Sequence, residues 1–122
     1  MKHESGFLKI VNKIRPNIHE LSVHEVHDMQ EHDEPFAFID VREESEVQHG
    51  ILPNAIHLSK GILERDIEKT IPNLTQKIVL YCGGGFRSAL AAHNLQQMGY
   101  VNVYSMMGGF RGWREAKYRI VD

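Results

Sequence analysis

Short apolar runs alternate with segments of helical periodicity along the chain, and this alternation restricts the fold more than any other feature. The predicted strands are residues 17–21, 36–39, 55–58, 77–81 and 101–104. The predicted helices are residues 22–31, 61–70, 87–98 and 110–117, with a polar helical turn at 43–49. The runs at 36–39 and 77–81 are apolar at successive positions, as in strands covered on both faces. The pattern predicts a parallel α/β sheet with right-handed crossovers, in which residues 77–81 form the central strand.

The beginning of the chain predicts a helix of its own. Its apolar stripe at helical spacing consists of Phe7, Ile10, Val11 and Ile14. The dipeptide Arg15-Pro16 ends this helix. We expect residues 1–16 to be a helical extension packed on a domain formed by residues 17–122. Polar residues interrupt the stripe, so the segment does not resemble a signal peptide.

Length and charge exclude several classes of function. The chain has 122 residues, enough to bury a core without a metal or a disulfide. Lys plus Arg is 14 and Asp plus Glu is 16, a formal net charge of −2 that does not suit a nucleic-acid binder. The longest apolar run, residues 78–82, is too short to span a membrane. The single cysteine forms no internal disulfide, so we expect a cytoplasmic protein.

Eight histidines raise the question of a metal site. His24, His27 and His32 lie in or next to one predicted helix, but only the first two share a face and no cysteine is near them. We therefore interpret them as part of a solvated polar face and expect no metal and no cofactor.

One segment carries the chemistry of the chain: Cys82, three glycines, Phe86, Arg87 and Ser88, between the central strand and a long helix. Ligands of parallel sheets bind beyond the carboxyl ends of strands, where the next helix offers unpaired N–H groups. Three glycines permit positive φ and let several amides converge on the sulfur. Arg87 adds a positive charge, so the loop favours the thiolate. The alternative interpretation is a small buried side chain beside a tight turn.

The order and spacing of four motifs resemble the rhodanese family in its single-domain form. The motifs are the loop from Cys82 to Arg87, Ile39-Asp-Val-Arg42 with Glu46, Gly50-Ile-Leu-Pro-Asn-Ala55 and Gly108-Gly-Phe-Arg-Gly-Trp113. Together they cover about residues 18–118. The chain departs from the family's pattern at several positions. Val47 stands where the family often has an aromatic residue, Ile51 where it often has a histidine and Gly83 where many members have a basic residue. Asn54 replaces a glycine but tolerates the left-handed conformation.

The resemblance implies a five-stranded parallel sheet between helices and a sulfurtransferase reaction. Cys82 would be the nucleophile, which takes sulfane sulfur from thiosulfate or a persulfide, holds it as its own persulfide and passes it to cyanide, a thiol or a protein sulfur carrier. The residues expected to cradle the outer sulfur are Gly83, Gly84, Gly85, Phe86, Arg87 and Ser88. We expect no nucleic acid or membrane partner, and a monomer or weak homodimer.

Five further residues have an expected role. Asp40 would be an acceptor that orients the loop, with a general base as the second reading. Arg42 and Glu46 have i, i+4 spacing and are expected to form a structural ion pair. Trp113 and Phe110 are expected in the core, and the second reading places them in a substrate wall.

Two other functions stay open at this point. Related folds use a cysteine and an arginine as phosphatases or arsenate reductases. Their loops hold one residue more than the four between Cys82 and Arg87, and the smaller ring suits a single sulfur atom. The other alternative is a non-catalytic binding module, since a fold alone does not establish activity.

Overall fold

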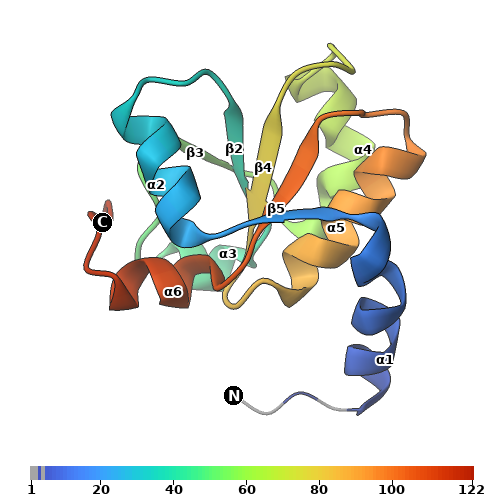
Figure 1. Ribbon diagram of the computed structural model, residues 1–122, viewed down its shortest axis with the longest axis horizontal. Helices are drawn as coiled ribbons and strands as arrows, with labels where there is room; N and C mark the ends of the chain where they lie inside the picture. The colour runs from blue at the N-terminus through green and yellow to red at the C-terminus, as the bar shows by residue number, and fades with distance from the viewer. Residues whose placement is uncertain (1–2, 4) are drawn as a thin grey trace.

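The computed structural model describes residue 3 and residues 5–122, which form a single sheet with helices on both faces (Figure 1). The sheet has five parallel strands in the order β1-β5-β4-β2-β3. The strands are β1 His19–Leu21, β2 Ala37–Asp40, β3 Ala55–His57, β4 Ile78–Tyr81 and β5 Val103–Met106. The predicted fold class and the central position of the fourth strand are confirmed.

Two helical layers enclose the sheet. The helices are α1 Ser5–Ile14, α2 Val23–Glu31, α3 Glu44–Val47, α4 Lys60–Thr70, α5 Phe86–Gln97 and α6 Gly109–Glu115, with a 3-10 turn η1 at Arg15–Asn17. Helices α1, α4 and α5 cover one face, and α2 and α6 cover the other (Figure 1). Buried side chains of the first layer include Val11, Leu63, Ile67 and Leu95, and those of the second include Val23, Val26, Phe110 and Trp113. The core positions expected for Phe110 and Trp113 are confirmed.

Local signals in the sequence place several element boundaries. The Ser22 hydroxyl accepts a hydrogen bond from the Glu25 amide at 3.1 Å, and the Glu25 carboxylate accepts one from the Ser22 amide at 3.0 Å. This is the predicted capping box of α2. Asn54 adopts a φ of 68°, the left-handed conformation that was expected.

The last strand differs from its prediction. β5 begins two residues later than predicted and continues through Ser105 to Met106. Ser105 has a low strand propensity, but it is hydrogen-bonded between two strands, opposite Glu20 of β1 and Leu80 of β4. Pairing on both sides therefore outweighs the local preference of the serine.

Helix α1 packs against α5 through a narrower stripe than its sequence predicts. Val11 is fully buried, and Phe7 and Ile14 are partly buried against the same core. Ile10 is instead 51% exposed, so this part of the prediction is wrong. Residues 1, 2 and 4 of the predicted extension lie outside the described residues, and its separation from a domain at 17–122 stays a prediction.

Candidate active site

Cys82 lies immediately after β4, at the carboxyl edge of the sheet, and is 1% exposed. The next three residues are glycines, and α5 begins at Phe86. The sulfur therefore faces the N-terminal end of a twelve-residue helix, where backbone N–H groups have no intrahelical partner. This is the edge at which parallel sheets bind ligands.

Two backbone amides point at the sulfur. The Gly85 amide donates a hydrogen bond to Sγ of Cys82 at 3.1 Å, and the Ser88 amide donates one at 3.4 Å. Gly85 reaches this position with a φ of 100°, a backbone conformation that residues with a Cβ rarely adopt. Of the three glycines only Gly85 is left-handed, so the expected freedom is used at one position of the loop.

A pair of buried hydroxyls lies behind the sulfur. Sγ of Cys82 donates to Oγ of Ser88 at 3.5 Å, and Oγ of Ser88 is 2.8 Å from Oγ of Ser105. Both serines are fully buried. When the sulfur is ionised, the directions of these two hydrogen bonds can reverse. The Ser88 hydroxyl then donates to the sulfur, and the Ser105 hydroxyl donates to Ser88. Ser105 was not predicted as a site residue.

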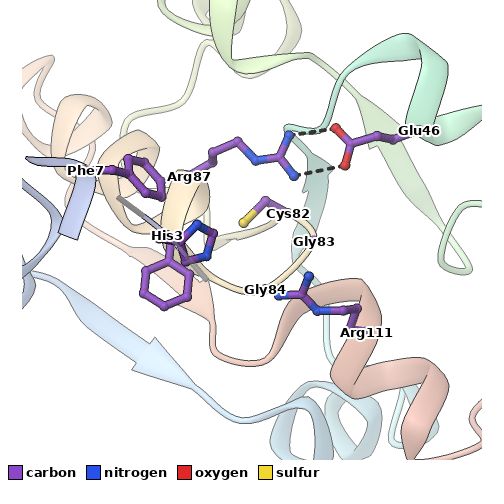
Figure 2. A pocket seen from close by; sticks show the side chains of 9 residues that line it. His3, Phe7, Glu46, Cys82, Gly83, Gly84, Arg87 and Arg111 are labelled. Carbon is purple, nitrogen blue, oxygen red and sulfur yellow. Dashed lines mark hydrogen bonds and ion pairs between the residues drawn. The ribbon is translucent and has the colours of Figure 1, made fainter. Parts of the chain in front are cut away.

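Arg87 enters the site as half of an ion pair. Its guanidinium donates two hydrogen bonds to the Glu46 carboxylate, at 2.7 and 3.0 Å (Figure 2). The hydrogen bonds from Arg87 lower the pKa of Glu46 to about 2, although partial burial opposes this shift. The same pairing raises the pKa of Arg87. The positive charge expected beside Cys82 is therefore already compensated by a carboxylate.

The predicted ion pair between Arg42 and Glu46 is wrong. Arg42 precedes Glu43, the extended residue at the start of α3, so the two side chains do not share a helical face. The Arg42 guanidinium instead binds the Asp40 carboxylate, with contacts of 2.7 to 3.1 Å. Helical spacing applies only within a helix, and this helix begins too late.

Asp40 and Arg42 lie in a buried network that supports the sheet edge. Tyr81, the residue before Cys82, donates its hydroxyl to Asp40 at 2.6 Å and accepts a hydrogen bond from the Leu52 amide at 3.1 Å. Burial and the nearby Asp40 raise the pKa of Tyr81, so its hydroxyl stays protonated. Arg42 donates a further bond to the Gly50 carbonyl at 2.7 Å. Asp40 thus contacts the residue before the cysteine rather than the sulfur.

Helix α6 holds the other side of the loop. The amides of Phe110 and Arg111 donate to the carbonyls of Cys82 and Gly83, at 2.8 and 3.0 Å. These carbonyls point toward α6, which turns the loop amides toward the sulfur. A Cβ at Gly109 would collide with the Cys82 carbonyl. The backbone of Gly109 is also left-handed, with a φ of 55°. Gly109, the first residue of α6, therefore permits the close approach of this helix to the loop.

A cavity of about 400 Å³ opens beside the sulfur. Its lining residues are His3, Phe7, Glu46, Cys82, Gly83, Gly84, Phe86, Arg87 and Arg111. In Figure 2, His3 and Phe7 lie on one side of Cys82, and Arg111 reaches toward Gly84 from α6 on the other. His3, Phe7 and Arg111 were not predicted as site residues, because they come from opposite ends of the chain.

The histidines have other partners than expected. The His27 ring stacks on Tyr118 at a centroid distance of 3.7 Å and is only partly exposed, so at this position the predicted solvated polar face is partly covered. Nδ1 of His24 is 2.6 Å from the Tyr118 hydroxyl. Among the described residues there is no group of three or more ligand side chains that could hold a metal ion. The same part of the chain contains no helix long and apolar enough to cross a membrane.

Solved structures of similar proteins share this architecture. A structure from Rhodopseudomonas palustris, described as a protein of unknown function and possible tyrosine phosphatase, superposes with a TM-score of 0.83 at 26% identity, covering 98% of this chain and 97% of that one. The polysulfide-sulfur transferase homodimer of Wolinella succinogenes gives a TM-score of 0.81 at 26% identity, covering 97% and 88% of the two chains.

Sequence comparison supports the same grouping. The thiosulfate sulfurtransferase GlpE of Coxiella burnetii is 33% identical over 75 residues, which are 62% of this chain and 68% of that protein. The family described as Rhodanese-like domain matches residues 22–116, a range that includes the cysteine loop, Glu46 and α6. With the parallel sheet and the loop geometry, this match shows that the chain belongs to the rhodanese-like domain family.

Proposed function

We propose that this protein is a sulfurtransferase that carries sulfane sulfur on Cys82 as a persulfide. The observation that carries the proposal is the pair of amides, from Gly85 and Ser88, that donate to the buried sulfur. Hydrogen bonds to an ionised acceptor are roughly twice as strong as those to a neutral one, so this arrangement favours a thiolate or a persulfide anion. The relatives named as sulfurtransferases support the proposal.

The reaction needs no redox cofactor. The Cys82 thiolate attacks the outer sulfur of thiosulfate, a bond forms between Sγ and that sulfur, and the donor S–S bond breaks with its electron pair leaving on sulfite. An acceptor such as cyanide or a thiol then attacks the outer sulfur of the persulfide. The second step releases thiocyanate or a new persulfide and returns the thiolate.

The loop offers further groups to the outer sulfur. Within the described chain, the amides of Gly83, Gly84, Phe86 and Arg87 make no hydrogen bond to Sγ. We assign the binding of the outer sulfur to this loop, from Gly83 to Ser88, because it borders the cavity. Asp40 and Arg42 would support the site through Tyr81 rather than take part in the chemistry. A reactive thiol of this kind suits the reducing cytoplasm.

The phosphatase alternative meets two obstacles in this site. Only four residues separate Cys82 from Arg87, which leaves a smaller ring than a phosphate cradle needs. Both ends of the Arg87 guanidinium are also engaged by Glu46, whereas a phosphate would need them. The described structure of a possible tyrosine phosphatase nevertheless makes this activity worth testing directly.

The experiment that tests the proposal is intact mass measurement after incubation with thiosulfate or polysulfide. We expect a gain of one sulfur atom, which cyanide removes as an equal amount of thiocyanate. Cys82→Ser should fold and gain no sulfur, because Cys82 is the only thiol. Hydrolysis of p-nitrophenyl phosphate without any sulfur uptake would favour the phosphatase, and neither reaction would favour a non-catalytic binding module.

A further inference from the structure

Two guanidinium groups border the cavity beside Cys82, and they differ in their partners. Arg87 gives both of its terminal nitrogens to Glu46. Arg111 makes no side-chain hydrogen bond or ion pair within the part of the chain that the structure describes. An anion that enters the cavity would therefore meet Arg111 as the cation with donors to offer.

The position of Arg111 depends on Gly84. Its guanidinium lies against the loop at this glycine, and a Cβ at Gly84 would collide with it. The helix that carries Arg111 is itself fixed to the loop through the Gly83 carbonyl. The loop thus has no side chain of its own at this point, and α6 places a cation there instead.

The opposite side of the cavity is lined by the side-chain rings of His3, Phe7 and Phe86. The His3 ring lies 5.1 Å from that of Phe7 and 4.5 Å from that of Phe86, measured between centroids. Phe7 comes from α1 and Phe86 from the first turn of α5. Phe7 and Phe86 form an apolar wall at the cavity, and the His3 ring packs against both of them. In Figure 2, the sulfur of Cys82 lies between the Phe7 ring and Arg111.

The cavity is also larger than an inorganic donor requires. Its volume of about 400 Å³ lies within the range of roughly 300–1,000 Å³ in which proteins bind organic ligands. Thiosulfate is a single tetrahedral anion, so it would leave most of this volume to water and would not touch the ring wall. Water against apolar rings is unfavourable, and an apolar group in its place would gain binding free energy.

We propose that the cavity selects organic sulfane-sulfur donors, with an anionic group on Arg111 and an apolar group on the wall formed by Phe7 and Phe86. This inference rests on the proposed function, because it specifies the donor of the same reaction. For a thiosulfonate donor, the Cys82 thiolate attacks the terminal sulfur. The S–S bond of the donor breaks, and the electron pair leaves on a sulfinate.

The ring wall is tested with two donors that differ only in their apolar group, methanethiosulfonate and benzenethiosulfonate. The measured quantity is the ratio of their kcat/KM values, compared between variants so that the intrinsic reactivity of each donor cancels. Phe7→Ala should lower the ratio of the benzene to the methane donor by about tenfold, a typical discrimination by an apolar pocket. Turnover of methanethiosulfonate by the same variant shows that it is folded.

The matched control for the wall is Ile10→Ala. Ile10 lies on the same helix, but its side chain is 51% exposed and does not line the cavity. This variant should keep the parental ratio, because it shortens an apolar side chain of α1 away from the donor. An equal loss in both variants would mean that the helix, and not the wall, is responsible, and would overturn the assignment of Phe7.

Arg111 is tested by alkylation of Cys82 with anionic iodoacetate and neutral iodoacetamide. Arg111→Gln should lower the ratio of the iodoacetate rate to the iodoacetamide rate by about three- to tenfold. The change is modest because the guanidinium is partly solvated. Gly84→Ala should lower the ratio in the same direction, since its methyl group displaces the guanidinium without removing the charge. Arg114→Gln, on an exposed position of the same helix, should leave the ratio unchanged.

The outcomes separate this inference from the proposed function. If no donor adds sulfur to Cys82, the sulfurtransferase proposal fails and the donor selection fails with it. If sulfur is added but neither Phe7→Ala nor Arg111→Gln changes its ratio, donor selection is overturned and the sulfurtransferase stands. We expect Phe7→Ala to lower the donor ratio and Arg111→Gln to lower the alkylation ratio, while both variants still use thiosulfate as a donor.

Discussion

Both carboxylate oxygens of Glu46 bind the guanidinium of Arg87, at 2.7 and 3.0 Å, on the rim of the cavity that contains Cys82. The two residues come from α3 and α5, which follow different strands of the sheet. The pair therefore ties the cysteine loop to the segment after β2. It also leaves less positive charge beside the sulfur than an unpaired arginine would supply.

The first prediction concerns this ion pair and pH. The pKa of Glu46 is lowered to about 2, so its charged form stabilises the folded state. This contribution is complete above the usual carboxyl range, near pH 4.5, and is lost as the pH falls toward about 2. Glu46→Gln should be less stable than the parent at neutral pH, and the difference should shrink across that window. Urea unfolding at a series of pH values measures it.

The size of this difference should be modest, because 36% of the Glu46 side chain is exposed. Asp66→Asn is the comparison at a second ion pair, because Arg65 also lowers the pKa of Asp66 and this pair lies away from the cavity, so its stability should change with pH in the same direction without affecting Cys82. A stability difference for Glu46→Gln that stays constant down to pH 2 would show that packing, and not charge, explains the effect.

The second prediction concerns the hydroxyl chain behind the sulfur. Ser105→Ala removes the group that lies 2.8 Å from Oγ of Ser88. The Ser88 hydroxyl would then be less well placed to donate to an ionised sulfur, and one hydrogen bond of this kind is worth about 0.5–1.5 kcal/mol. We expect alkylation of Cys82 by iodoacetamide at neutral pH to slow by about two- to tenfold. The rate should approach that of the parent at alkaline pH.

A purely structural role for Ser105 would give a different result. Loss of packing alone would lower the melting temperature without altering how the alkylation rate depends on pH. Ser59→Ala serves as a control, because Ser59 precedes α4 and makes no capping hydrogen bond. An unchanged pH profile in Ser105→Ala would remove this residue from the site.

Much of the fold was predictable because its signals are local. The capping box at Ser22 and the left-handed Asn54 depend on residues within a few positions of each other. The cysteine loop is local as well, since the amides of Gly85 and Ser88 lie only three and six residues after Cys82. Helical spacing failed at Arg42 because the helix begins after it, and no pattern in that segment marks the boundary sharply.

The remaining parts of the site depend on contacts between distant segments. Glu46 and Arg87 are brought together by the order of the strands, and Arg111 reaches Gly84 because α6 packs on the loop. Phe7 borders the cavity because α1 packs on α5. A sequence without related sequences beside it contains no signal for these contacts, although Glu46 and Arg111 both lie in motifs that resemble those of the family.

The third prediction concerns the buried network below the loop. Tyr81→Phe removes a hydroxyl that donates to Asp40 at 2.6 Å and accepts from the Leu52 amide at 3.1 Å. Both partners are buried and would lose a hydrogen bond, at a cost of about 1–3 kcal/mol for an unsatisfied group. We expect the free energy of unfolding to fall by about 2 kcal/mol in chemical denaturation. Tyr104→Phe is the control, because the Tyr104 hydroxyl makes no hydrogen bond within the described residues.

The last prediction concerns Gly85, which combines a φ of 100° with an amide that donates to the sulfur. A Cβ there would lie 3.3 Å from the Gly108 amide nitrogen and 3.4 Å from the Met107 Cα, both of them backbone atoms. Gly85→Ala should therefore lower stability by about 1–2 kcal/mol and slow alkylation of Cys82 as its amide turns away. Gly61→Ala should instead raise stability by about 0.5–1 kcal/mol, because Gly61 lies in α4 with open space around it. Thermal unfolding and iodoacetamide kinetics measure both effects, and a Gly85→Ala protein with parental alkylation rates would show that this amide does not activate the sulfur.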